Sequence, residues 1–203
     1  MQQVSKLMLS DEEQQLVNDT GWILTKRIIM DKAGELLGLV STQIQAVMEA
    51  EKDQLPDAVL RSVPKIARGE NYLLLPYLIL DHPRCFAGED IFAVRTMFWW
   101  GNFFSVTLHL AGKYKTQFQQ YILEKDMQEL NDLFICIHEN QWQHHFEAGN
   151  YTAVNTLTKE KVGEVISHKP FVKLAMKFPL HSWPHIPVLV NKAVAAMLQL
   201  LKN

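Results

Sequence analysis

The segment IFAVRTMFWWGNFFSVTLHLA, residues 91–111, decides the fold that the sequence predicts. It contains two runs of β-branched and aromatic residues, which favour strands, on either side of Gly101-Asn102. Glycine adopts a positive φ without steric cost, so this pair suits a two-residue turn between antiparallel strands. The segment therefore predicts a β-hairpin, and the rest of the chain is expected to pack around it.

A two-residue turn fixes which hairpin side chains share a face, because side chains alternate along a strand. It places Thr96 opposite Thr107, and Val94 opposite His109. The expected polar face carries Thr96, Ser105, Thr107 and His109, and the expected apolar face carries Ala93, Arg95, Met97, Trp99, Phe104, Val106, Leu108 and Leu110. The apolar face is expected to pack on helices. A three-residue turn would shift the register by one position and exchange these assignments.

The composition is that of an ordinary globular chain: of 203 residues, 48% are hydrophobic and 21% are charged. This length suits a single domain, expected to span residues 1–203. The formal net charge of −2 argues against a broad nucleic-acid surface, so nucleic-acid binding is not expected. No apolar run reaches the roughly 18 residues of a membrane span, and residues 1–15 do not resemble a signal peptide. With two cysteines only, the sequence predicts a soluble, cytoplasmic protein.

Helices are predicted on both sides of the hairpin. Ser10 and Glu13 form a capping-box pattern that starts a short helix, and a long amphipathic helix is expected over residues 26–51. Further helices are expected over residues 114–126, 158–167, 171–178 and 188–201. Residues 171–178 also alternate like a strand, so this segment has two interpretations.

Strands are predicted at residues 72–80 and from residue 133 to about 139, and residues 140–147 suit either a strand or a short helix. Pro76 cannot donate a hydrogen bond, which indicates an edge strand or a bulge. The predicted fold class is α+β. A small antiparallel sheet of three to four strands is built on the 91–111 hairpin and covered by the long N-terminal helix and the C-terminal helices.

A ligand site is predicted at Thr107, His109 and His138, which neighbouring strands would bring to one sheet face. Arg68 and Tyr72 lie where the first strand begins, and a guanidinium pairs well with carboxylate or phosphate. The alternative is structural: a core histidine hydrogen-bonded to a carbonyl, and an arginine paired with a surface carboxylate.

No metal site or cofactor is predicted, although the chain has eight histidines. On a strand, His138 and His144 would lie about 20 Å apart. On a helix, His138 and His145 would be separated by about 10 Å of rise. Neither pair reaches one ion with bonds near 2 Å. The glycine-rich nucleotide motifs and the Gly-x-Ser-x-Gly elbow are absent from the sequence, so the catalytic residues stay unassigned.

Two further features of the hairpin have structural interpretations. Arg95 lies among apolar residues and is expected to pair with Glu70, Asp90 or Glu139, because a lone buried cation is costly. Trp99 and Trp100 suit packing at the hairpin tip, and they suit a partner-binding patch if the tip is exposed.

The sequence favours a non-catalytic module that binds a ligand or a protein partner, with homodimer formation through apolar surfaces also expected. The alternative is a small enzyme that uses His109 and His138 as acid and base on an anionic small molecule. An enzyme requires a titratable side chain within hydrogen-bonding distance of either histidine. A binding module requires an exposed aromatic patch or an apolar interface.

Overall fold

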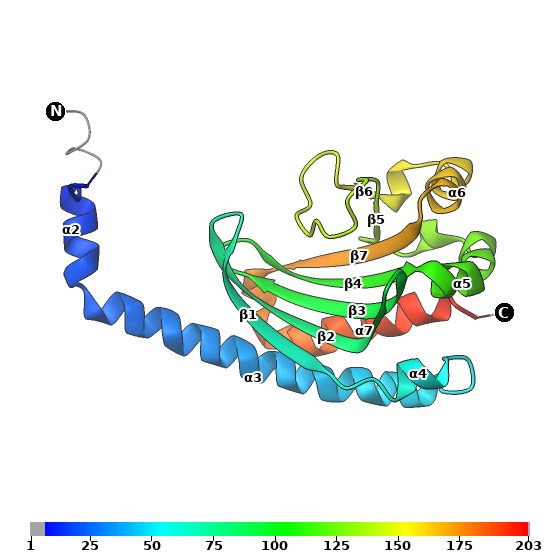
Figure 1. Ribbon diagram of the computed structural model, residues 1–203, viewed down its shortest axis with the longest axis horizontal. Coiled ribbons are helices and arrows are strands. Elements are labelled where there is room, and N and C mark those ends of the chain that lie inside the picture. The colour runs from blue at the N-terminus through cyan, green and yellow to red at the C-terminus, as the bar shows by residue number, and fades with distance from the viewer. Residues whose placement is uncertain (1–6, 203) are drawn as a thin grey trace.

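A seven-stranded antiparallel sheet forms the centre of the computed structural model, which describes residues 7–202 (Figure 1). The strand order is β1-β2-β3-β4-β7-β5-β6. The strands are β1 (Lys65–Tyr72), β2 (Leu75–Ala87), β3 (Asp90–Trp99), β4 (Phe103–Ala111), β5 (Phe134–Cys136), β6 (Tyr151–Ala153) and β7 (Phe171–Pro179). The α+β class with an antiparallel sheet is confirmed, but the prediction of three to four strands was wrong.

Helices cover one face of this sheet and one of its ends (Figure 1). They are α2 (Asp11–Asn18), α3 (Thr20–Ala50), α4 (Asp57–Leu60), α5 (Gly112–Glu124), α6 (Lys159–His168) and α7 (Ile186–Gln199), with 3-10 turns at Met127–Glu129, Val154–Thr156 and Leu180–His185. α3 and α7 lie side by side along the same face. Among residues 7–202, no helix combines the length and the apolar character that crossing a membrane requires.

The two N-terminal helices follow from local sequence signals. Ser10 and Glu13 form the predicted capping box at the start of α2. The side chain of Asp19 accepts a hydrogen bond from the backbone N–H of Trp22 and starts α3 six residues earlier than residue 26. The buried residues of α3 are spaced by three or four positions, so one stripe of the helix packs on the sheet: Met30, Ala33, Leu37, Val40, Ile44 and Met48.

The hairpin forms as predicted, but its register differs by one position. Its loop has three residues, and Trp99 therefore pairs with Phe103. The backbone N–H of Trp100 donates to the carbonyl of Pro76 near the start of β2 (3.0 Å), and Gly101 adopts a φ of +73°. Because Trp100 bonds to the neighbouring strand, it does not extend the β3–β4 ladder. Three-residue hairpin loops of this kind use glycine at a positive φ.

The register change corrects the predicted faces. Thr96 and Thr107 point to opposite sides, because Thr96 now pairs with Val106 and Thr107 pairs with Arg95. The face toward α3 and α7 carries Phe92, Val94, Thr96 and Phe98 with Phe104, Val106, Leu108 and Leu110. Thr96 is fully buried there, and its hydroxyl makes no hydrogen bond within the described residues. Arg95 therefore lies on the polar face, beside Thr107 and His109.

Several segments differ from the sequence-based expectation. Residues 171–178 form strand β7 rather than a helix, and β7 pairs with β4 near the centre of the sheet. β1 precedes the strand predicted at residues 72–80 and was not predicted. β2 continues past Asp81 to Ala87, and its pairing with β1 is irregular opposite Pro76, as the bulge interpretation predicted. After β5, residues 137–150 form a loop instead of extending the strand.

Candidate ligand-binding site

The loop of residues 137–150 lies over the sheet face opposite α3 and α7 (Figure 1). It contains no strand or helix, so few of its backbone groups are satisfied by regular pairing. Side chains from the sheet bind its backbone instead. The loop is thus held in place by the polar residues of the face beneath it.

Lys173, in β7, is the most buried of these residues, with 1% of its surface exposed. Its Nζ donates to the carbonyl oxygens of Gln141 and Gln143, each at 2.7 Å, and lies 5.3 Å from the centre of the Tyr151 ring. Burial lowers the pKa of Lys173 to about 8. The ammonium therefore fixes the loop backbone at two positions.

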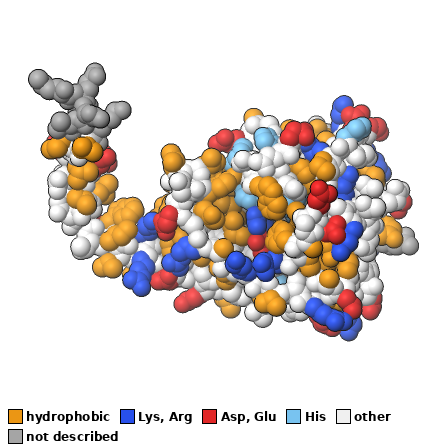
Figure 2. All heavy atoms as spheres, in the orientation of Figure 1, with side chains coloured by type: hydrophobic (Ala, Val, Ile, Leu, Met, Phe, Trp, Pro, Cys, Tyr) orange, Lys and Arg blue, Asp and Glu red, His pale blue; other side chains and the backbone are white. Residues whose placement is uncertain are grey.

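Arg95 connects the sheet to the loop from β3. Its Nε and Nη2 donate to both carboxylate oxygens of Asp81, at 2.7 and 2.9 Å, and its Nη1 lies 2.9 Å from Nε2 of His144. Since the guanidinium is a donor only, His144 accepts at Nε2 and is neutral. Burial, with Lys173 and Arg95 nearby, lowers the pKa of His144 to about 2. Figure 2 shows histidine, basic and acidic side chains gathered in a hollow among hydrophobic ones.

Tyr72, at the end of β1, holds the middle of the loop. Its hydroxyl oxygen accepts hydrogen bonds from the backbone N–H groups of His144 (2.7 Å) and His145 (3.0 Å). Asn150 is fully buried, and its side-chain amide donates to the carbonyl of His145. These contacts hold the middle of the loop, at His144 and His145, in a fixed position over the sheet face.

His109, in β4, contacts the first part of the loop. Its Nε2 lies 2.7 Å from Oε1 of Gln141, so the ring is protonated at Nε2 and donates to the amide oxygen. Burial, and then the charge of Lys173, lowers the pKa of His109 to about 3. The ring also lies 5.5 Å from the ring of Trp142, edge to face. His109 is therefore a neutral residue that positions Gln141 and Trp142.

An open groove of about 650 Å³ runs beside this part of the loop. Its lining includes Gly88, Glu89, Ile91, Ala111, Lys115, Gln141 and Trp142. Gly112, with a φ of +57°, lies so close to the β2–β3 turn that an added Cβ would be 2.8 Å from the carbonyl oxygen of Glu89. This close approach brings the turn and the start of α5 together as one wall of the groove. The loop forms the other wall. We call this feature the Trp142 groove.

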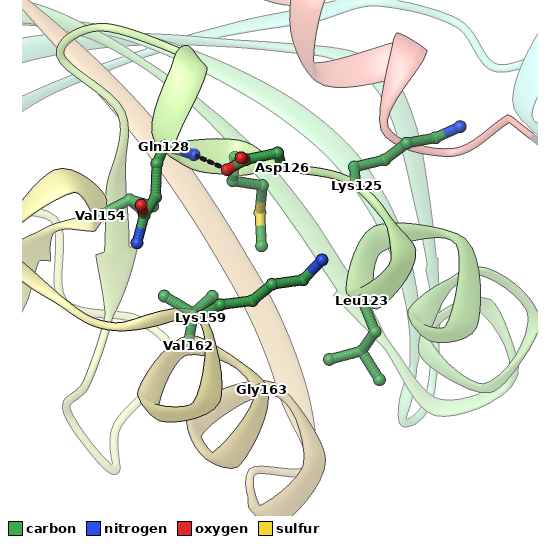
Figure 3. Close-up of a pocket in the computed structure, with 9 residues that line it drawn as sticks. Leu123, Lys125, Asp126, Gln128, Val154, Lys159, Val162 and Gly163 are labelled. Atoms are coloured by element: carbon green, nitrogen blue, oxygen red, sulfur yellow. Dashed lines mark hydrogen bonds between the residues drawn. The ribbon is translucent and has the colours of Figure 1, made fainter.

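A second cavity, beside α5 and α6, is too small for a ligand. It measures about 20 Å³, which is room for about one water molecule (Figure 3). Leu123, Val154 and Val162 line it, and the side chain of Lys159 points into it. The Trp142 groove is therefore the better candidate for a binding site.

Of the five predicted ligand-binding residues, Tyr72 and His109 bind the loop, and Thr107 pairs with Arg95 on the sheet face beneath it. Arg68 lies elsewhere, because its β1 position faces α3 and its guanidinium pairs with Asp31 at 2.8 Å. His138 begins the loop, and its Nδ1 accepts from the backbone N–H of Asn140 at 2.9 Å. No bond joins His138 to His109 within the described residues.

The two tryptophans predicted to bind a partner have different environments. Trp99 is 5% exposed, and its Nε1 donates to the carbonyl of Tyr72. Trp100 is half-buried and lines a hollow near Trp22 and Lys26, at the base of the N-terminal helices. A role in partner binding stays a prediction for both residues.

Sequence reasoning missed several residues of the site. Arg95 was expected to pair with Glu70, Asp90 or Glu139, but these carboxylates bind Lys26, Lys113 and Lys169, and Arg95 binds Asp81. Lys173 was missed because its segment was assigned to a helix. Its alternation with Phe171 and Ala175, the signal of a strand, was present in the sequence. Among residues 7–202, no cluster of three metal-ligating side chains occurs.

Comparison with known protein families, with curated proteins and with solved structures finds no match. The function must therefore be argued from the geometry of the groove and of the loop beside it.

Replacing Lys173 by methionine is expected to loosen the loop while the sheet stays folded. The carbonyls of Gln141 and Gln143 lose their donor, at a cost of about 1–3 kcal/mol in the free energy of unfolding. The amide protons of His144 and His145 should exchange faster with solvent, which hydrogen-exchange NMR measures. The control is Lys161→Met, at an exposed position of α6 where the ammonium pairs with Glu164. Equal exchange rates in the Lys173→Met and Lys161→Met variants would contradict this role.

Acid is expected to destabilise the protein through His109 and His144. Both pKa values lie below the ordinary 6.5 in the folded state, so between pH 6.5 and about 3 the unfolded chain binds protons that the folded chain excludes. Stability should fall with falling pH in this window, by about 1.4 kcal/mol per pH unit for each histidine. Urea unfolding at several pH values measures the slope. His109→Gln should reduce it, whereas the exposed-site variant His181→Gln should not; identical slopes for all three proteins would refute the assignment.

Proposed function

We propose that this protein is a non-catalytic binding module that takes a small planar molecule carrying a negative charge in the Trp142 groove. The observation that carries the proposal is the groove itself, about 650 Å³, with an exposed tryptophan on a wall that buried polar residues hold in place. Ligand sites in proteins commonly have volumes of about 300–1,000 Å³ and combine apolar walls with a few polar groups.

Trp142 supplies the apolar wall. Its side chain is 46% exposed although it is the largest residue of the loop, and its ring lies 6.2 Å from the ring of Phe86, which is also exposed. Two adjacent exposed aromatic rings favour a flat partner, because aromatic faces stack on planar groups. Ile91 and Ala111 extend the apolar lining beneath them.

Lys115 and Gln141 supply polar groups. The ammonium of Lys115 has a distant acceptor, the carbonyl of Ser167 at 3.5 Å, and burial lowers its pKa. A carboxylate or sulfonate on the ligand would give this cation a closer partner. Oε1 of Gln141 accepts from His109, and the side-chain NH₂ makes no hydrogen bond within the described residues, so it is available to a ligand.

The groove wall is held rigid before any ligand binds. Gln141 is fixed at its backbone by Lys173 and at its side chain by His109, and His109 also contacts the ring of Trp142. A preorganised wall reduces the entropy lost on binding. This arrangement favours a binding role for the buried polar residues over a purely structural one.

Acid–base catalysis has less support. His109 is hydrogen-bonded to an amide rather than to a titratable side chain, and a pKa of about 3 makes it a weak base at neutral pH. His138 bonds to a backbone N–H. Neither histidine meets the geometric requirement that separates an enzyme from a binding module.

The proposal predicts that 2-naphthoate binds in the groove and that Trp142→Ala weakens this binding about tenfold or more, since the stacking surface is lost. Titration followed by ¹H–¹⁵N NMR measures it in every variant through the backbone amides of Gly88 and Gln141, which line the groove, and in the wild type also through the indole N–H of Trp142. Lys115→Gln should weaken 2-naphthoate selectively and leave the uncharged 2-naphthamide little changed.

The matched control is Trp22→Ala, which removes a tryptophan of similar exposure, 49%, that does not line the groove. It should leave binding unchanged. Absence of any shift at the Trp142 indole with either naphthalene probe, or equal affinity of wild type and Trp142→Ala, would overturn the proposal.

A further inference from the structure

The N-terminal arm, residues 11–29, projects from the body of the molecule (Figure 1). No residue of α2 is buried, and the first buried residue of α3 is Met30. The arm is joined to the body near its base, where Lys26 pairs with Glu70 of β1 at 2.6 Å. More than two helical turns of α3 and all of α2 therefore have no core of their own.

The arm exposes large apolar side chains, and Figure 2 shows them as a hydrophobic surface along it. Six of them are between 48% and 66% exposed: Leu16, Val17, Trp22, Ile23, Leu24 and Ile28. At the bend between α2 and α3, four of them line a hollow of about 450 Å³: Leu16, Val17, Trp22 and Ile23. Exposed apolar clusters of this kind mark interaction surfaces.

An isolated helix of the length of α2 is marginal in water, because helices shorter than about 12–15 residues lack enough propagation to offset nucleation. The capping box supports its first turn, but no packing supports the rest. A stable α2 therefore requires a partner that covers its apolar side.

The charges on the arm indicate what that partner is. Residues 7–25 contain four acidic residues, Asp11, Glu12, Glu13 and Asp19, and no lysine or arginine. The next residues along α3 include Arg27 and Lys32, which form no ion pair within residues 7–202. The N-terminal part of the arm is thus acidic, whereas α3 carries two exposed basic residues without ion pairs within the described residues, Arg27 in the arm and Lys32 just beyond it.

The spacing of these residues matches an antiparallel contact between two arms. Glu12 lies four residues before Leu16, and Lys32 lies four residues after Ile28, so on each helix the charge and the apolar residue share a face. An antiparallel arrangement that brings Leu16 against Ile28 also brings Glu12 against Lys32. The same register places Glu13 near Asp31, whose charge is paired with Arg68. A parallel arrangement brings acid against acid.

We propose that the arm is a self-association surface, on which α2 of one copy packs against the first turns of α3 in a second copy, and the reverse. The contact is isologous, as a two-fold dimer requires, because each copy supplies both the acidic and the basic side of the contact. An anionic membrane is a poorer partner, since the polar faces of interfacial helices are rich in lysine and arginine.

Sedimentation of the full chain over a range of concentrations tests the proposal. The expected result is a reversible species of twice the 23.4 kDa chain mass. Ile28→Gln should raise the dimer dissociation constant about tenfold or more. Leu39→Gln, at a 60%-exposed site farther along α3, is the matched control and should leave it unchanged.

Charge reversal tests the antiparallel geometry directly. Glu12→Lys and Lys32→Glu should each weaken self-association, because each creates two repulsive contacts per dimer. An equimolar mixture of the two variants should form a heterodimer of near wild-type stability, since every contact in it is again between opposite charges.

Three results would overturn the proposal: a monomer at every concentration, a dimer unaffected by Ile28→Gln, or two charge variants that fail to rescue each other. Co-sedimentation of the monomer with phosphatidylserine-containing vesicles, lost in Ile28→Gln but not in Leu39→Gln, would assign the arm to membranes instead. None of these results bears on the binding of 2-naphthoate to the Trp142 groove, so the two proposals stand or fall separately.

Discussion

The bond from the backbone N–H of Trp100 to the carbonyl of Pro76 is the constraint on which the site depends. Because of this bond, Trp100 does not pair with β4, and the last pair of the β3–β4 ladder is Trp99 with Phe103. Since side chains alternate, this single position decides which residues face the helices and which face the loop. With the other register, Arg95 would point into the apolar layer formed with α3 and α7, and the described residues of that core cluster include no carboxylate to pair with it.

Once that register is set, the face beneath the loop is polar and must be satisfied. Arg95 pairs with Asp81, and Lys173 donates to two loop carbonyls. Burying these groups costs free energy, and each bond offsets part of that cost only if the loop stays in place. The loop is therefore ordered by the charges that it buries. Its outer side chains, Gln141 and Trp142, become a fixed wall of the groove.

The sequence predicts the elements whose signals are local. The capping box at Ser10, the stripe of α3 and the hairpin are all visible in the residue pattern. The register was not predictable in the same way, because β3 is buried on both faces and apolar residues do not distinguish them. The observed register is the one that follows from a three-residue turn, the alternative to the predicted two-residue turn.

The site itself depends on contacts between distant segments, which a local pattern does not specify. Lys173 becomes a buried donor only when residues 171–179 pair with β4, more than sixty positions earlier in the chain. The loop has no periodicity, so its path is set by Tyr72, Lys173 and Arg95 from three different strands. His109 was identified as a candidate because a histidine interrupted an apolar strand. The residue that it positions, Gln141, gave no such signal.

The most direct test of the account is the backbone register of β3 and β4, measured in solution by cross-strand proton contacts in an isotope-labelled sample. The structure requires contacts between Arg95 and Thr107 and between Ala93 and His109. Contacts between Thr96 and Thr107 and between Val94 and His109 would contradict it, because they would turn Arg95 toward the helices and remove the polar surface on which the loop is held.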